Sequence, residues 1–282
     1  MKVSATRTGA VALTTMLAPI TWGTTYLVVT ELMPADRPLL VAAARVVPAG
    51  LLLLAIGLLT SGWRPRGREW RHLVLLSLVN FGLFFPLLVG ATYRVPGGVI
   101  ASLAGLQPLL VLAGTWIVAG AVPRRLDVGV SLVAAVGVLL VVGVPSGTLD
   151  PFGLLLAMGA NVSFAAGVVL TRHLPAPPDR IGHTGWQLVL SGLVIVPLAL
   201  VIEGVPEHVS GPNLIGLVYL GVITTGLASV LWFSGIPRLP VAAPPLLGLA
   251  SAITGVIVGW LVLGQSLTVA GSLGFVITLG AI

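Results

Sequence analysis

Polar side chains able to bind a solute are scattered singly through long apolar stretches of this 282-residue chain. They carry hydroxyls, amides and aromatic rings, and the candidates are Trp22, Thr25, Tyr26, Asn80, Gln107, Asn161, Ser163 and Ser251. An amide without a hydrogen-bond partner in an apolar environment costs free energy, so these groups are expected to face the protein interior. Whether they bond a solute or one another stays open from the sequence.

Trp22 differs from the other six tryptophans. Those six fall at or near the ends of apolar stretches, where aromatic belts form in membranes: Trp63, Trp70, Trp116, Trp186, Trp232 and Trp260. Trp22 instead lies eleven residues into such a stretch from Val11, with Tyr26 one helical turn further on. The pair predicts an aromatic cavity wall that stacks on a ring or a cation, with packing between helices as the alternative.

Arg45 is the one charged residue inside an expected membrane span. A charge at that depth is a functional candidate by default. Arg45 also lies about two turns from a helix end, so its long stem can reach the interface or bond carbonyls of a neighbour. The sequence favours this structural role, and substrate contact is the alternative.

Three further residues concern helix geometry. Pro108 is the best candidate for a functional kink, because a proline inside a helix frees a carbonyl and permits a bend. Gly255 and Gly259 form a pair of small residues four apart, which predicts close helix contact within one chain or between two copies.

Residue types that support catalysis or metal binding are sparse. There is no Cys, and no pair of the four histidines sits at ligand spacing. We expect loops to hold all four: His72, His173, His183 and His208. No Asp or Glu falls inside an expected span, so the sequence predicts no catalytic residue, no metal and no cofactor. An intramembrane enzyme is therefore a weak alternative.

The composition sets the class of protein. Hydrophobic residues make up 57% of the chain and charged residues 8%, whereas soluble domains carry about a quarter charged residues. A chain this apolar needs lipid around it, so we expect an all-α, polytopic membrane protein.

Ten stretches of roughly 20 residues, uncharged except for Arg45, mark the expected spans. They are Gly9 to Thr30, Pro38 to Thr60, Leu73 to Thr92, Pro96 to Val118, Val128 to Val144, Pro151 to Thr171, Gly185 to Ile202, Asn213 to Ile236, Val241 to Leu263, and Ser266 to Ile282.

The charges between these spans predict the orientation. With the N-terminus in the cytoplasm, one face receives eleven basic residues and the other receives Arg37 and Arg94. This bias fits the cytoplasmic membrane and explains the net charge of +6, so no nucleic-acid partner is expected.

The two halves of the chain resemble each other weakly. A shift of 144 residues places Trp116 on Trp260 and the run from Arg94 to Pro96 on the run from Arg238 to Pro240. This predicts two five-helix repeats, residues 1–145 and 146–282. Five helices end on the side opposite their start, so the second repeat is expected to be inverted, with a substrate cavity between the halves.

Four short motifs carry a family resemblance. They are the stretch from Ala18 to Tyr26, Ala44 with Arg45, Leu106 to Pro108, and Ala160 to Ala165. Together the motifs resemble the EamA type of the drug/metabolite transporter superfamily. Three positions depart from that pattern, namely Ala121, Ala252 and Gln265.

The resemblance implies two inverted five-helix repeats around a central cavity. It also implies a secondary transporter of a metabolite, amino acid or drug-like solute, working as an exporter or exchanger in the lipid bilayer. A membrane protein with a structural or partner-binding role is the alternative. The sequence leaves the oligomeric state open.

Overall fold

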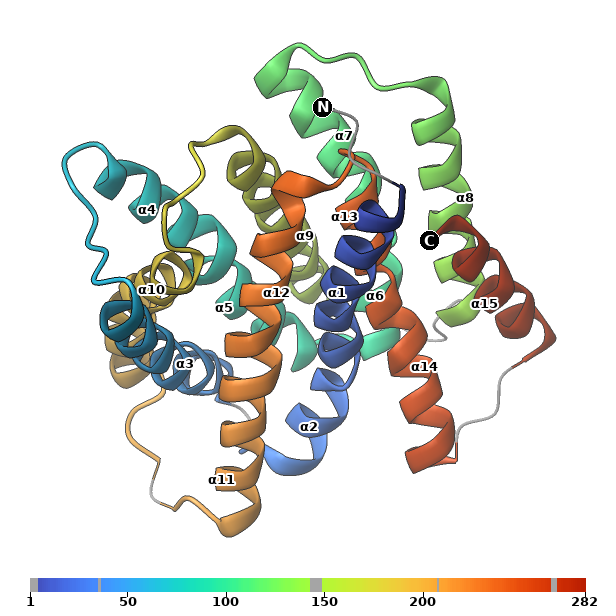
Figure 1. The fold of residues 1–282 in the computed structure, drawn as a ribbon. Coiled ribbons are helices and arrows are strands. Elements are labelled where there is room, and N and C mark those ends of the chain that lie inside the picture. Colours follow the sequence, from blue (N-terminus) through green and yellow to red (C-terminus); the bar gives the residue numbers. More distant parts are fainter. Residues whose placement is uncertain (1–4, 35–36, 143–148, 207, 265–267) are drawn as a thin grey trace.

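A computed structural model describes residues 5–34, 37–142, 149–206, 208–264 and 268–282 of the chain. These residues form helices joined by turns and loops and contain no strand (Figure 1). The elements are α1 (Ala5–Gly23), α2 (Thr25–Leu32), α3 (Pro38–Thr60), α4 (Glu69–Ser77), η1 (Leu78–Gly82), α5 (Phe84–Thr92), α6 (Gly97–Ala104), α7 (Gln107–Ala119), α8 (Arg125–Val142), α9 (Pro151–His173), α10 (Arg180–Ile202), α11 (Gly211–Val218), η2 (Tyr219–Leu227), α12 (Ala228–Gly235), η3 (Ile236–Arg238), α13 (Ala243–Gly248), α14 (Ala250–Leu263) and α15 (Val269–Ala281).

The expected all-α membrane fold is confirmed. Within the described residues, eight helical segments are long and apolar enough to cross a membrane. The other two expected spans correspond to α8, which has 18 residues, and α15, which has 13. The end of the fifth expected span and the start of the tenth lie outside the described residues. Long apolar runs form helices here because a helix satisfies its own backbone hydrogen bonds in lipid.

Several spans are interrupted where the sequence predicts continuous helix. The first span breaks at Thr24, the fourth at Gly105 and Leu106, and the ninth at Leu249. At each break, backbone bonds connect residues three apart, as in Thr24 N–H to the Thr21 carbonyl at 3.2 Å. The third and eighth spans contain the π-helical segments η1 and η2. Such irregular turns change the direction of the side chains that follow them.

Two of these irregularities recur at one spacing. The break at Gly105, shifted by 144 residues, falls on the break at Leu249. Residues 78–82 of η1, shifted equally, become 222–226, which lie inside η2. The break at Thr24 has no counterpart, because α9 runs uninterrupted from Pro151 to His173.

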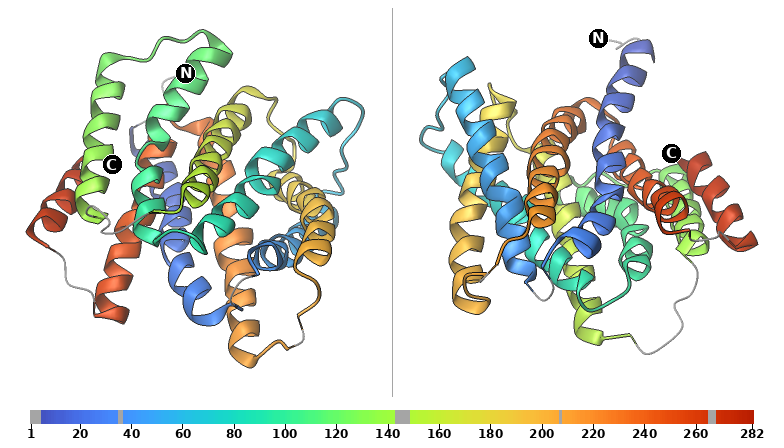
Figure 2. Two further views of the ribbon diagram at one scale, coloured as in Figure 1. Left: turned by 180° about the vertical axis from the view of Figure 1, so that it is seen from behind. Right: turned by 90° about the horizontal axis from the view of Figure 1, so that it is seen from below.

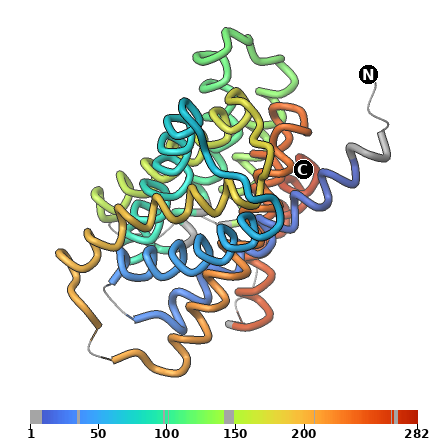
Figure 3. The backbone as a smooth tube through the Cα atoms, turned by 60° about the vertical axis from the view of Figure 1, so that its left-hand side comes forward, coloured from blue at the N-terminus to red at the C-terminus, as the bar shows by residue number. Residues whose placement is uncertain are grey.

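Two tightly paired helices stand at each edge of the molecule. α3 packs along α10, and α8 along α15, on opposite sides of the bundle (Figures 1 and 2). α3 and α10 run side by side as the blue and gold tubes of Figure 3. A Cβ added at Gly50 would lie 2.8 Å from the Val189 backbone nitrogen, so glycine is required for this approach.

The loops at the two ends of the bundle bond to one another. At one end, both carboxylate oxygens of Glu203 accept hydrogen bonds from the backbone N–H groups of Leu39 and Leu40, at 2.7 and 2.8 Å. At the other end of α3, the Ser61 hydroxyl donates to Asp179 at 2.7 Å. Contacts at both ends hold α3 and α10 antiparallel, which fixes one wall of the space between the helices.

Candidate functional site

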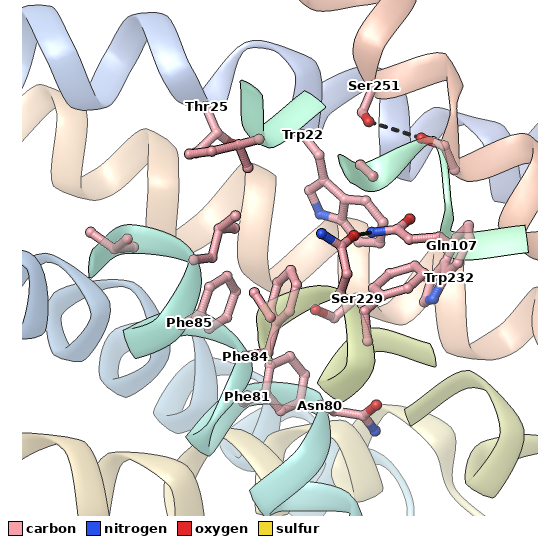
Figure 4. A pocket seen from close by; sticks show the side chains of 18 of the residues that line it. Trp22, Thr25, Asn80, Phe81, Phe84, Phe85, Gln107, Ser229, Trp232 and Ser251 are labelled. Atoms are coloured by element: carbon pink, nitrogen blue, oxygen red, sulfur yellow. Dashed lines mark hydrogen bonds between the residues drawn. The ribbon is translucent and has the colours of Figure 1, made fainter. Parts of the chain in front are cut away.

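A cavity lies between the helices, with an empty volume of about 1140 Å³ including its mouth. Residues of α1, α2, α3, η1, α5, α6, α7, α9, α12, α13 and α14 line it (Figure 4). Seven of the eight predicted solute-binding residues lie in this lining: Trp22, Thr25, Tyr26, Asn80, Gln107, Asn161 and Ser251.

Trp22 stands in an aromatic cluster at the centre of the bundle. Its ring meets Trp232 edge to face at a centroid distance of 5.1 Å, and Phe164 at 6.2 Å. Its indole N–H donates to the Thr224 carbonyl at 2.9 Å, within η2. The bond fixes the ring, since rotation would leave a buried polar group without a partner.

Three phenylalanines continue this surface. Phe81, Phe84 and Phe85 project from η1 and α5 into the space beside Trp22 (Figure 4). Phe81 stacks on Phe85 at 5.9 Å, and Phe84 lies 5.9 Å from Phe164. Aromatic rings thus form a connected part of the cavity wall, which favours a solute with a flat apolar part.

The prediction that Trp232 lies near a membrane interface is wrong. It is buried in α12 and lines the cavity, because the eighth helix continues through η3 to Arg238 and Trp232 faces inward. The sequence reasoning also missed the phenylalanines, although five of the seven in the chain line the cavity: Phe81, Phe84, Phe85, Phe164 and Phe233. Three of them cluster within residues 81–85, a signal that was present in the sequence.

The amide side chains bond other amides across helices. Gln107 donates to the Asn161 side chain at 2.9 Å, and Asn161 donates to the Ala157 carbonyl. Asn80 donates to Gln187 of α10, also at 2.9 Å. These bonds join α7 to α9 and η1 to α10, so the amides cross-link the helices around the cavity. Asn80, Gln107 and Asn161 also line the cavity, so each amide takes part in both arrangements.

Gln107 and Ser251 occupy matching places, each just after a helix break. Pro108 follows Gln107 and has no N–H to donate to the carbonyl of Ala104, where α6 ends. In the ninth span, the Ser251 hydroxyl donates to the Gly248 carbonyl at 2.8 Å, where α13 ends. The two breaks therefore use different chemistry, and both place a polar side chain in the cavity.

Two of the predicted hydroxyls have different surroundings. The Thr25 hydroxyl is buried and has no hydrogen-bond partner, and Thr25 lines the cavity. Ser163 is not part of the lining, because its hydroxyl donates to the Val79 carbonyl at 2.6 Å and so joins α9 to η1.

Arg45 lies inside the bundle and bonds a neighbouring helix rather than extending to the surface, and its partners are hydroxyls where the sequence suggested carbonyls. Its exposed fraction is 1%, and it lines the cavity. Its Nε and Nη2 groups donate to the hydroxyls of Thr225 and Thr224 at 3.3 and 3.2 Å. The guanidinium lies 4.4 Å from the centre of the Phe85 ring.

Gly255 packs against another helix of the same chain. A Cβ added there would lie 3.5 Å from the Gly23 carbonyl oxygen, and one added at Gly23 would lie 3.0 Å from the Gly255 nitrogen. Gly259, one turn further, is buried. The close contact between α1 and α14 falls next to Trp22 and helps to set the position of its ring.

The prediction that all four histidines lie in loops is wrong for three of them. His72 lies in α4, His173 ends α9 and His183 lies in the first turn of α10. These helices extend beyond the hydrophobic ranges used to define the spans. The described residues contain no group of three His, Cys, Asp or Glu side chains placed to hold a metal ion.

The chain matches a family of transporters. The profile of the EamA-like transporter family matches residues 9–143 and again 151–282. Protein PecM of Dickeya dadantii is 37% identical over 94% of this chain and 88% of that protein. A WAT1-related chloroplastic protein of Arabidopsis thaliana is 27% identical over 93% of this chain and 66% of that protein.

A crystal structure of another protein has the same fold, with a TM-score of 0.78 at 20% identity, covering 97% of this chain and 95% of that one. The helical membrane fold and the central cavity together define a polytopic membrane transporter. The chain belongs to the EamA-like transporter family.

Proposed function

We propose that the protein is a secondary transporter that moves a small organic solute across the cytoplasmic membrane as an exporter or exchanger. The observation that carries this is the central cavity, in which the wall around Trp22 meets the amides of Gln107 and Asn161. The family whose profile matches both halves is a family of transporters, which supports transport over intramembrane catalysis.

The two halves are proposed to be inverted five-helix repeats, residues 1–145 and 146–282. The double match of the family profile and the recurrence of the helix break and π segment at a spacing of 144 residues support this arrangement. Related halves that exchange conformations give two states of similar energy, open to opposite sides of the membrane. Pro108, beside one break, is the proposed hinge.

Polar and aromatic residues lie between the cavity and a second pocket. Asn80 and Phe233 belong to the cavity lining, and Asn80 is bonded to Gln187 behind it. The second pocket is lined by Gln187 and Phe233 together with His183. We propose that parting of Asn80 from Gln187 joins the two spaces in the opposite state.

The proposal is tested by transport in proteoliposomes loaded with a mixed metabolite pool, with mass spectrometry of what crosses. Wild-type protein is expected to exchange at least one solute. Trp22→Ala and Gln107→Ala are expected to reduce its rate about tenfold, since each removes one or two contacts to the solute.

Trp260→Ala is the matched control, because this tryptophan is 58% exposed and lies outside the cavity lining. It is expected to transport as the wild type does. No exchanged solute, or equal rates in Trp22→Ala and wild type for an identified one, would overturn the proposed function of this cavity.

Orientation is tested with single cysteines, since the native chain has none. Cys at Ser210 is expected to react with an impermeant maleimide from outside, and Cys at Ala176 is not. Ser146 and Ser61 are further positions for the outer and inner faces, although Ser146 lies outside the described residues. Labelling of Ala176→Cys from outside in sealed cells would reverse the proposed orientation.

A further inference from the structure

Arg45 has an unmet hydrogen-bonding group inside the cavity. Its Nη1 atom is buried and has no hydrogen-bond partner, while its other two nitrogens bond only threonine hydroxyls at 3.2 and 3.3 Å. A buried donor left unpaired costs free energy, and a charged donor costs more than a neutral one. The guanidinium is therefore prepared for a ligand that the protein itself does not supply.

No acidic residue balances this charge. The residues that line the cavity include no Asp and no Glu, so Arg45 gives the lining a net charge of +1. The one salt bridge among the described residues joins Arg94 to Asp150, away from the cavity lining. An arginine keeps its charge at neutral pH, so a bound anion is the remaining source of compensation.

Thr224 ties the charge to the aromatic wall. Its hydroxyl accepts from Arg45, and its carbonyl accepts from the indole of Trp22 at 2.9 Å. The phenyl ring of Phe85 lies under the guanidinium, and Phe84 is 5.3 Å from Phe85. The charged group and the aromatic surface are thus held next to each other by one residue.

We propose that the cavity binds an aromatic carboxylate, with the carboxylate on Arg45 and the ring against Trp22, Phe84 and Phe164. This rests on the proposed function and specifies its substrate class. A carboxylate accepts two hydrogen bonds from one guanidinium, which would satisfy Nη1. Aromatic rings alone also attract cations, but Arg45 in the same lining repels them. An added ammonium group finds no acidic partner there.

A ligand series on one skeleton tests the charge preference in purified wild-type protein in nanodiscs. Radiolabelled 3-phenylpropionate is the probe, displaced by 3-phenylpropanamide, 3-phenylpropylamine or phenylalanine. Charge-assisted hydrogen bonds differ from neutral ones by enough to predict at least about tenfold tighter binding of the carboxylate than of the amide. The amine and phenylalanine are expected to bind more weakly than the carboxylate.

Variants assign the preference to a residue. Arg45→Gln is expected to reduce the ratio between carboxylate and amide to about one, and Arg45→Lys to restore part of it. Arg64→Gln is the control, because Arg64 lies exposed in the loop after α3 and should leave the ratio unchanged.

Absence of saturable 3-phenylpropionate binding, equal binding of the amide, or tighter binding of the amine in the wild type would overturn the inference. It would also fall if Arg45→Gln kept the full preference. The ligand series measured on wild-type protein tests the charge preference even if Arg45→Gln does not fold. If the protein transports a solute but shows no preference for the carboxylate, the proposed function holds and this inference fails. If it prefers the carboxylate but transports nothing, the binding site holds and the proposed function fails.

Discussion

The α3–α10 contact and the aromatic cavity show two opposite ways of placing helices. At the edge, glycines such as Gly50 and Gly57 let the two backbones touch, and the side chains of Leu188 and Ile195 are fully buried. In the centre, rings of Trp22 and Phe164 keep the helices apart. Small residues therefore bring two helices into direct backbone contact, while large ones border the central cavity.

The largest expected effect comes from filling the tight contact. Gly185→Leu places a side chain against the backbone of Leu53 and Leu54 in α3, which has no room for it. Overpacking of this kind costs about 1–3 kcal/mol or more, so we expect little folded protein. The measurement is the monodisperse fraction after detergent extraction. Gly129→Leu is the control, since no atom lies within 4 Å of a Cβ there, and wild-type behaviour of Gly185→Leu would contradict the tight packing.

A pair of truncations compares the two regions directly. Leu188→Ala is expected to cost about 2–5 kcal/mol, because Leu188 is 0% exposed and a void would remain. Phe84→Ala is expected to cost less, since Phe84 borders space that is already empty. Thermal melting of the purified variants gives the order. A lower melting temperature for Phe84→Ala than for Leu188→Ala would mean that the cavity wall contributes more to stability than the α3–α10 contact does.

A smaller loss is expected at the end of the α3–α10 pair. Glu203→Ala removes the acceptor for the N–H groups of Leu39 and Leu40 at the first turn of α3. Loss of such a cap costs about 1 kcal/mol. That corresponds to a melting temperature lower by about 2–4 °C. Glu31→Ala is a control at the same end, because Glu31 is exposed on α2. Equal melting temperatures for Glu203→Ala and wild type would show that the Glu203 carboxylate does not stabilise the first turn of α3.

The smallest effect concerns the exposed Arg94–Asp150 contact, which is 3.0 Å long. The hydrogen bond from Arg94 lowers the pKa of Asp150, and the backbone N–H of Phe152 adds to this. Because this pKa is lower in the folded state, the contact stabilises the fold at pH values above the pKa that Asp150 has in the unfolded chain. The stabilisation is lost as the pH falls through the pKa of Asp150 in the folded protein. Asp150→Asn should therefore melt slightly below wild type at about pH 7 and approach it in acid, near pH 3. A larger difference in acid would contradict this sign.

Long apolar runs made the helical class and most span ranges predictable, because hydrophobicity decides which segments enter lipid. Position within the apolar stretches also made Trp22 and Gln107 candidates for the interior, and the structure brings them to one cavity. The sequence did not reveal the break at Thr24 or the π segments, because single backbone bonds and contacts with other helices decide them. Trp232 was misplaced for the same reason, since its depth follows from η2 and η3.

The chemistry around Arg45 was equally beyond the sequence. Spacing from a helix end suggested a side chain at the interface or one bonded to a neighbour's carbonyls. The partners of Arg45 are hydroxyls that lie 179 and 180 residues further along the chain, in η2. Contacts this distant in sequence leave no local pattern. The role of the glycines of α10 likewise becomes visible only in the structure, which shows which helix each one meets.

The central claim is that a solute passes through the aromatic cavity by alternating access. Ala104→Cys tests it most directly, because Ala104 lines the cavity beside the α6–α7 break and the native chain has no other thiol. The measurement is modification by a small impermeant anionic methanethiosulfonate in right-side-out and inverted vesicles, followed by transport. The account predicts modification from both sides and loss of exchange, with Leu193→Cys on the exposed face of α10 leaving exchange intact. Modification from one side only, or exchange that survives full modification, would contradict it.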